Sequence, residues 1–146
     1  MRKLDADLAE ILGPEAEPAK PILKAVPKSN DQWDRCKQWI EAGLENSPLT
    51  IEDVRKAVEG GGAILWPGKN SAIVSEFIDY PSGLRTAAVM SAGGELEEIR
   101  AMTPGLEAFA RLNGASEVLL EGRLGWKRAL KDDGYELASV TLRKKL

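Results

Sequence analysis

The sequence predicts one mixed α/β domain preceded by an extended arm, and three observations lead to this fold class. The 146 residues fit the length of a single domain. The stretch from Leu84 to Gly122 reads as strand, glycine turn, helix and strand, and such a βαβ unit places its two strands parallel with the helix across one face. Two amphipathic helices and an antiparallel meander precede it. We therefore expect a mixed sheet with the order βααβββαβαβ over residues 21–146.

The arm covers residues 1–20. Its apolar residues recur at helical spacing, at Leu4, Leu8, Ile11 and Leu12. Gly13-Pro14 ends this short helix, and a proline-rich linker continues to Pro21. Two interpretations stay open: a disordered tail, or an anchor whose apolar stripe binds another protein chain.

The domain begins with a short strand and two helices. Residues 21–27 are bounded by prolines, which favours an edge strand. Ser29 and Gln32 have capping-box spacing and begin a helix that reaches about Asn46. Thr50 caps a second helix, which ends at the glycines 60–62. The first helix has an apolar face that we assign to the core: Trp33, Cys36, Ile40 and Leu44.

The remaining elements follow from alternation and from turn residues. Residues 63–66, 71–79 and 84–92 form the meander, joined by tight turns. The helix after Gly94 meets Thr103-Pro104, which predicts either a kink or a restart with Thr103 as the N-cap. A second parallel strand covers residues 116–121, a helix runs from 123 or 124 to 131, and a final strand covers 136–145.

Composition excludes several classes of protein. A formal net charge of −3 gives no electrostatic reason to expect a nucleic-acid partner. No apolar run approaches the roughly 20 residues of a membrane span, and the acidic N-terminus does not resemble a signal peptide. Cys36 is the only cysteine and there is no histidine, so the commonest general base and the commonest zinc ligand are both missing. We expect no metal site.

Several motifs resemble the GNAT superfamily, the acyl-CoA N-acyltransferase fold. The family has a helix that ends in Gly-Phe/Tyr-Glu before its last strands, and Gly134-Tyr135-Glu136 matches it. Within the family, the chain is most similar to small GNAT-like proteins encoded by tailed phages and prophages. The motifs shared with those proteins are Trp66-Pro67-Gly68, Asp79-Tyr80-Pro81, Ala92-Gly93-Gly94 and the helix from Gly125 to Leu130.

The resemblance also places a cofactor loop, and the sequence departs from it there. GNAT enzymes hold the pyrophosphate of acetyl-CoA on a loop of the form Arg/Gln-x-x-Gly-x-Gly/Ala, and the matching segment is 90–95. If the chain binds acetyl-CoA, Gly93 and Gly94 are its cofactor residues. The basic residue is missing, and carboxylates occupy the first helical turn at Glu95, Glu97 and Glu98. Because these charges repel an anionic cofactor, we expect no measurable acetyl-CoA binding.

The second departure concerns the general acid. Many GNAT enzymes place a tyrosine where this chain has Leu130, which has no proton to donate. Tyr135 belongs to the Gly-Tyr-Glu turn and is assigned to packing. Glu76 and Asp79 on the meander are alternative bases, but isolated carboxylates on strands are usually solvated. We therefore assign no catalytic residue.

The leading functional interpretation is a non-catalytic GNAT-like module, a virion structural or assembly component of a tailed phage that is anchored by its arm. Its partners are then other phage structural proteins, with no nucleic acid and no membrane, in the virion or in the host bacterial cytoplasm during assembly. The alternative is an acetyl-CoA-dependent N-acetyltransferase with an atypical pyrophosphate loop. A third interpretation is an adaptor that inhibits or redirects a host enzyme.

Overall fold

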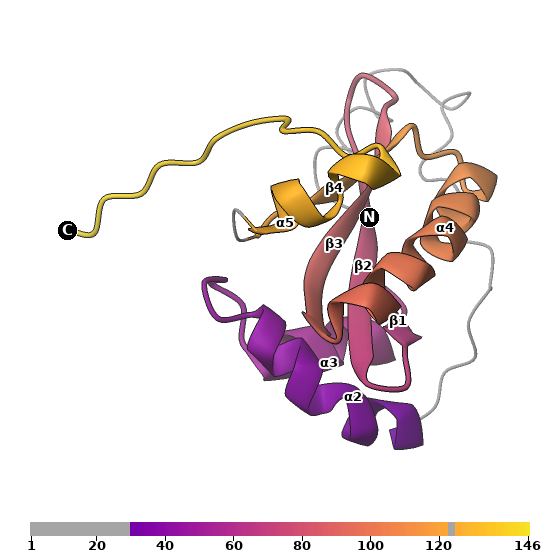
Figure 1. The fold of residues 1–146 in the computed structure, drawn as a ribbon, viewed down its shortest axis with the longest axis vertical. Coiled ribbons are helices and arrows are strands. Elements are labelled where there is room, and N and C mark those ends of the chain that lie inside the picture. The colour runs from indigo at the N-terminus through magenta and orange to yellow at the C-terminus, as the bar shows by residue number, and fades with distance from the viewer. Residues whose placement is uncertain (1–29, 123–124) are drawn as a thin grey trace.

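The computed structural model describes residues 30–122 and 125–146 (Figure 1). The predicted arm at 1–20, the predicted edge strand at 21–27 and Ser29 lie outside these residues. In chain order the elements are α2 (Asn30–Gly43), α3 (Ile51–Glu59), β1 (Ala63–Pro67), β2 (Ser71–Asp79), β3 (Arg85–Gly94), α4 (Leu96–Leu112), β4 (Glu117–Leu120), α5 (Gly125–Ala129) and the 3-10 helix η1 (Lys131–Asp133).

The strands form one sheet in the order β1-β2-β3-β4. The strands β1, β2 and β3 pair antiparallel, and β3 pairs parallel with β4. The predicted meander and the predicted parallel βαβ unit are therefore both confirmed. The mixed α/β fold class is confirmed with them.

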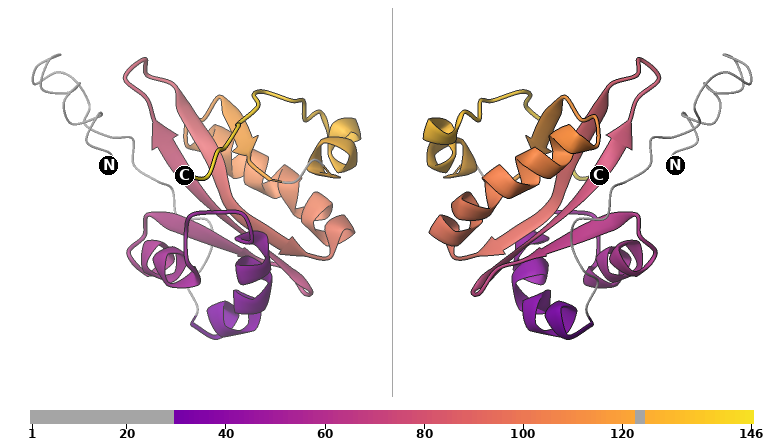
Figure 2. Two further views of the ribbon diagram at one scale, coloured as in Figure 1. Left: turned by 90° about the vertical axis from the view of Figure 1, so that its left-hand side faces the viewer. Right: turned by 90° about the vertical axis from the view of Figure 1, so that its right-hand side faces the viewer.

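Helices cover both faces of this sheet, with α2 and α3 on one face and α4 on the other (Figure 2). The α2 side holds the apolar face predicted for the first helix, packed with Val54, Leu65 and Val74. Burial raises the pKa of the Cys36 thiol, as expected of a core residue. On the α4 side, Ile73, Ile99 and Leu106 form a second cluster.

Local signals predicted the start of α3 and left two alternatives for α4. The capping box at the start of α3 is present, because Thr50 and Asp53 each bond the backbone of the other. Of the two alternatives at Thr103-Pro104, the structure excludes the restart, since α4 runs through Pro104 as one helix. Pro104 has no N–H to donate to the carbonyl of Arg100, and the Thr103 hydroxyl donates to that oxygen instead at 2.9 Å.

A buried arginine fastens the β2–β3 hairpin. The Arg85 side chain is 2% exposed and pairs with both carboxylate oxygens of Asp79, at 2.5 and 2.8 Å. It also donates to the carbonyl of Asn113 at 3.1 Å, and its guanidinium lies 5.1 Å from the ring centroid of Phe77. This network joins the hairpin to the end of α4.

The C-terminal part departs from the sequence prediction. The helix predicted for 123 or 124 to 131 is shorter, as α5 followed by η1. The strand predicted for residues 136–145 is wrong, because no ladder includes this segment. Strand propensity needs a partner edge to take effect, and the segment runs clear of its own sheet (Figure 1). Among the described helices, none has the length and apolarity to cross a membrane.

Candidate functional site

The pairing of β3 with β4 stops halfway along β3. The ladder runs from Thr86↔Glu117 to Val89↔Leu120, whereas β3 continues to Gly94. Within the described residues, the segment from Met90 to Gly94 thus has no strand partner on its β4 side. Backbone N–H and C=O groups on such an edge are available to a ligand that can pair as a strand does.

A β-bulge lies where the ladder stops. Across β2, Val74 pairs with Ser91 but Ser75 pairs with Val89, so Met90 is the extra residue on β3. The side chains show the consequence. Met90 packs against the α2 cluster and the next residue, Ser91, donates to the carbonyl of Ile40 in α2 at 2.7 Å. The bulge bends the strand and places two successive side chains on one face.

The two glycines predicted to bind a cofactor follow this bulge, and the structure gives each a packing role. A Cβ on Gly93 would overlap the carbonyl of Trp39 in α2. Gly94 has φ +102° and a Cβ there would lie 2.5 Å from the Cα of Ser71. Their contact with a cofactor stays a prediction.

Helix α4 begins directly after Gly94. Its N-cap residue, Glu95, makes no side-chain capping bond. The N-cap side chain therefore occupies none of the backbone N–H groups in the first turn of the helix. The Glu95 amide itself donates to the carbonyl of Asn70 at 3.0 Å. The candidate site is therefore the open edge of β3, from Met90 to Gly94, together with the first turn of α4.

The carboxylates in the first turn of α4 have different contacts. Glu98 turns toward the β1–β2 turn, where it accepts hydrogen bonds from the Asn70 amide at 2.8 Å and from the Ser71 hydroxyl. These bonds, led by that of Ser71, lower the pKa of Glu98. On the other side of the turn, Arg35 of α2 donates to the carbonyls of Gly68 and Lys69 at 2.7 and 3.1 Å. The turn is thus held between a cation and an anion.

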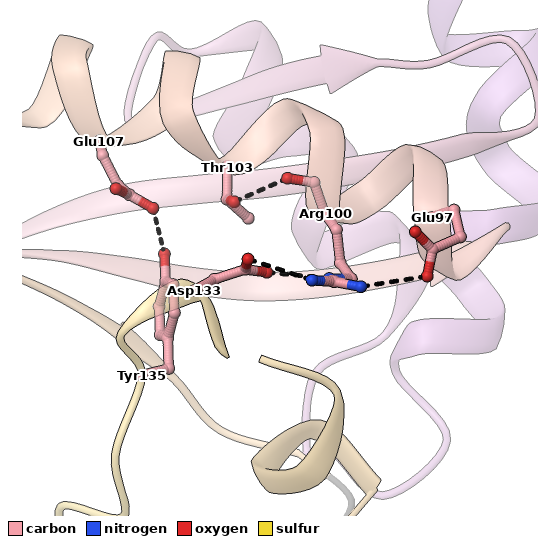
Figure 3. A network of polar contacts seen from close by, with 6 residues as sticks. All are labelled: Glu97, Arg100, Thr103, Glu107, Asp133 and Tyr135. Atoms are coloured by element: carbon pink, nitrogen blue, oxygen red, sulfur yellow. Dashed lines mark hydrogen bonds and ion pairs between the residues drawn. The ribbon is translucent and has the colours of Figure 1, made fainter. Parts of the chain in front are cut away.

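Glu97, unlike Glu98, has a cation as its partner. It pairs with Arg100 at 3.3 Å, and Arg100 pairs through two nitrogens with Asp133, at 2.9 and 3.1 Å (Figure 3). This Arg100–Asp133 pair fastens η1, and with it the preceding α5, to the first turns of α4. Glu98 stays ionised, because its hydrogen bonds come from neutral groups and lower its pKa. Arg100 brings one positive charge against the two carboxylates of Glu97 and Asp133. The first turn of α4 therefore keeps the negative charge that the sequence predicted.

No proton donor of the family type lies at the expected position. Leu130 is 1% exposed and belongs to the core. Tyr135 donates its hydroxyl to Glu107 of α4 at 2.9 Å (Figure 3). Burial, and after it this hydrogen bond, raises the pKa of Tyr135. Asp79 forms an ion pair with Arg85. Among the described residues, no group of three or more possible ligands is arranged to hold a metal ion.

Sequence reasoning missed the bulge and the different contacts of Glu97 and Glu98. The run Ala88-Val89-Met90-Ser91-Ala92 is small or apolar throughout, so alternation gives no warning of an extra residue. The bulge shows in the strand register and in the packing. Val89 and Ala92 both contact the α4 cluster, although a spacing of three would place them on opposite faces of a regular strand.

No protein-family model matches the chain, and no curated protein matches it in sequence. Solved structures do match it. An acetyltransferase from Trypanosoma brucei has a TM-score of 0.61 at 12% identity, over 84% of this chain and 97% of that one. Glucosamine-6-phosphate N-acetyltransferase from Arabidopsis thaliana has a TM-score of 0.57 at 10% identity, over 83% and 97%.

A third structure, TTHA1254 from Thermus thermophilus, has a TM-score of 0.58 at 18% identity, over 85% of this chain and 97% of that one. At these identities the likeness shows the fold alone. The chain has the GNAT fold, and acetyltransferases are among its structural neighbours. None of these three structures is described as a phage or virion protein.

Proposed function

We propose that the chain binds acetyl-CoA and transfers its acetyl group to an amine. The observation that carries this proposal is the open edge of β3 at the Met90 bulge, where the β3–β4 ladder stops while β3 continues. The alternative drawn from the sequence thereby becomes the preferred function, ahead of a non-catalytic module.

The open edge matches the chemistry of the pantetheine arm. That arm is extended and carries amide groups, so it pairs with exposed backbone as an added strand does. Beyond Val89, the backbone of β3 offers such groups on the β4 side. The bulge re-aims the amide of Met90 or Ser91, as bulges beside active sites do, and a re-aimed amide can donate to the thioester carbonyl.

The phosphates would lie at the first turn of α4. Its uncapped amides and helix dipole favour an anion. The exposed bases Lys127 and Arg128 belong to α5, which the Arg100–Asp133 pair holds near this turn through η1. The carboxylates of Glu95, Glu97 and Glu98 oppose phosphate binding there. We therefore expect an affinity that falls with added salt.

The transfer step needs no group that this chain lacks. A neutral amine attacks the thioester carbon, the C–N bond forms, the C–S bond breaks, and the thiolate leaves with the electron pair. The amine nitrogen then loses its proton to water. With Leu130 at the family's acid position, that position gives no proton to the thiolate, so we expect a slower transfer than an enzyme with a positioned acid would give, by about 10²–10⁴-fold.

The test is calorimetric titration of the full chain with acetyl-CoA at low salt. We expect micromolar binding. Deleting Met90 pairs Val89 and Ser91 with successive residues of β2 and restores regular alternation, so it removes the bulge and should abolish binding. Met90→Leu keeps the bulge and should keep the affinity. Thermal unfolding of both variants checks that the fold survives.

Two results would contradict the proposal. One is the absence of binding by the folded full chain at millimolar acetyl-CoA. The other is unchanged affinity in the folded Met90 deletion. Release of free thiol in the presence of amines then tests transfer separately from binding.

An assembly role for the arm is a separate proposal and rests on the sequence pattern alone. Leu4, Leu8, Ile11 and Leu12 lie outside the described residues. We propose that they dock on another protein chain, a phage structural protein if the resemblance to phage-encoded proteins holds. This role is compatible with acetyl transfer, because it uses a different part of the chain.

A further inference from the structure

The end of β4 lies in line with the open edge of β3. The β3–β4 ladder ends at Val89↔Leu120, so Leu120 occupies the plane of the sheet at the point where the open edge begins. With its phosphates at the first turn of α4, a pantetheine arm that pairs with residues 94 to 90 runs toward this end of β4. The acyl group at the tip of the arm then has to turn out of the sheet toward the α2 face or the α4 face.

On the α4 face, an indole occupies the space beside the end of β4. Trp126 of α5 packs against the α4 cluster, to which Val89 also belongs. A Cβ on Gly122 would lie 2.8 Å from Cδ1 of this indole and 3.8 Å from a methyl group of Leu120. Because side chains in such a cluster are close-packed, an acyl group on the α4 face would have to displace Trp126.

The α2 face, on the opposite side of the sheet (Figure 2), has a more adaptable wall. At Ser91 this face is held by backbone contacts: the Ser91 hydroxyl donates to the carbonyl of Ile40 at 2.7 Å, and a Cβ on Gly43 would overlap that hydroxyl. Met90, the residue before it, is half-buried and packs against the α2 cluster. Its side chain is unbranched with three rotatable bonds, so it can make room for a small group.

We propose, resting on the function proposed above, that the acyl group turns to the α2 face and that the Met90 side chain limits its length. The site then selects acetyl over longer acyl groups. Met90 has this position because it is the extra residue of the bulge, which lies beside the last pair of the β3–β4 ladder and turns its side chain toward α2.

The selection should be graded. A methylene that a pocket excludes changes transition-state or ligand binding by about 10–200-fold, and a flexible thioether gives values at the low end of this range because it can change rotamer. Butyryl-CoA is two methylenes longer than acetyl-CoA. We therefore expect the full chain to bind butyryl-CoA at least about tenfold more weakly than acetyl-CoA.

The experiment is calorimetric titration of the full chain at low salt with acetyl-CoA, propionyl-CoA and butyryl-CoA, and the readout is the ratio of their dissociation constants. Met90→Ala removes more volume than two methylenes occupy, so it should bring the ratio of butyryl-CoA to acetyl-CoA close to one. Met90→Val shortens the side chain, suits a strand, and should shift the ratio in the same direction. Met102→Ala is the matched control, because Met102 is also half-buried but packs against the α4 cluster, and it should leave the ratio unchanged.

Thermal unfolding shows which variants are folded. A wild-type chain that binds butyryl-CoA as tightly as acetyl-CoA would overturn the inference while leaving the proposed function intact. So would folded Met90 variants with the wild-type ratio. A change of ratio in Met102→Ala as large as in Met90→Ala would place the acyl group on the α4 face instead. Binding of none of the three thioesters would contradict the proposed function itself, and the role of Met90 with it.

Discussion

Gly93 lies directly against the backbone of Trp39: a Cβ on residue 93 would overlap the carbonyl oxygen and come within 3.0 Å of the carbonyl carbon. A glycine of α2 lies equally close to β3, because a Cβ on Gly43 would lie 2.7 Å from the carbonyl oxygen of Ala92. Helix α2 and the end of β3 thus approach backbone to backbone. The candidate site is built on this contact.

The first prediction concerns these glycines. Gly93→Ala should lower the free energy of unfolding by about 3 kcal/mol, because neither backbone can move aside without disturbing α2. Gly105→Ala is the matched control, since its Cβ meets nothing within 4 Å in the middle of α4 and should stabilise by about 0.5–1 kcal/mol. Urea denaturation measures both. Equal effects would contradict the packing role of Gly93.

The second prediction concerns the buried ion pair. Asp79→Ala leaves the Arg85 guanidinium, 2% exposed, without its carboxylate and should cost about 3–5 kcal/mol. The double variant Asp79→Ala, Arg85→Met removes the uncompensated charge and should recover part of that loss. Chemical denaturation of the two variants gives the comparison. A double variant less stable than Asp79→Ala would show that Arg85 acts through its other contacts.

The third prediction concerns pH. Hydrogen bonds from Ser71 and Asn70 favour the Glu98 carboxylate and lower its pKa in the folded chain. The unfolded chain therefore binds the proton first, near pH 4.3 for an ordinary glutamate (about the model-peptide value). The stabilisation is full above that pH and is lost as the pH falls through the folded pKa. Glu98→Gln should flatten the loss of stability in this acidic range, as followed by thermal unfolding.

The fourth prediction concerns the arm. Deleting residues 1–20 should leave the unfolding midpoint of the domain unchanged and abolish binding to the partner chain. A helix this short is marginal alone, below about 12–15 residues, so its apolar stripe gains stability only against a partner. Replacing Leu4 and Leu8 by Lys should act like the deletion, while Asp7→Ala should not. Normal assembly of the truncated chain would reduce the arm to a tail.

The elements that depend on residues close together in the sequence could be predicted. The capping box at Thr50 and Asp53 depends on residues three apart and is present as expected. The antiparallel meander follows from alternation and tight turns, and the parallel pairing of β3 with β4 follows from the single crossover through α4.

The features that depend on distant parts of the chain could not be predicted. The sequence placed Glu98 in the first turn of α4. It did not show that the Glu98 carboxylate accepts a hydrogen bond from the Asn70 amide in the β1–β2 turn, 28 residues earlier. Thr103-Pro104 predicted either a kink or a restart, and the sequence did not show that the Thr103 hydroxyl supplies the donor that Pro104 lacks. The segment 136–145 has the composition of a strand, and composition does not say which edge receives it.

The sheet order β1-β2-β3-β4 repeats the order of the chain, and this has a consequence for how fast the domain folds. None of the described strands has to insert between two that are already paired, so the meander can grow by short loop closures. The one slow closure brings β4 to β3 across the length of α4. We expect the transition state to contain β2 and β3 with α2, so that substitutions at Val74 slow folding, whereas those at Val118 mainly speed unfolding.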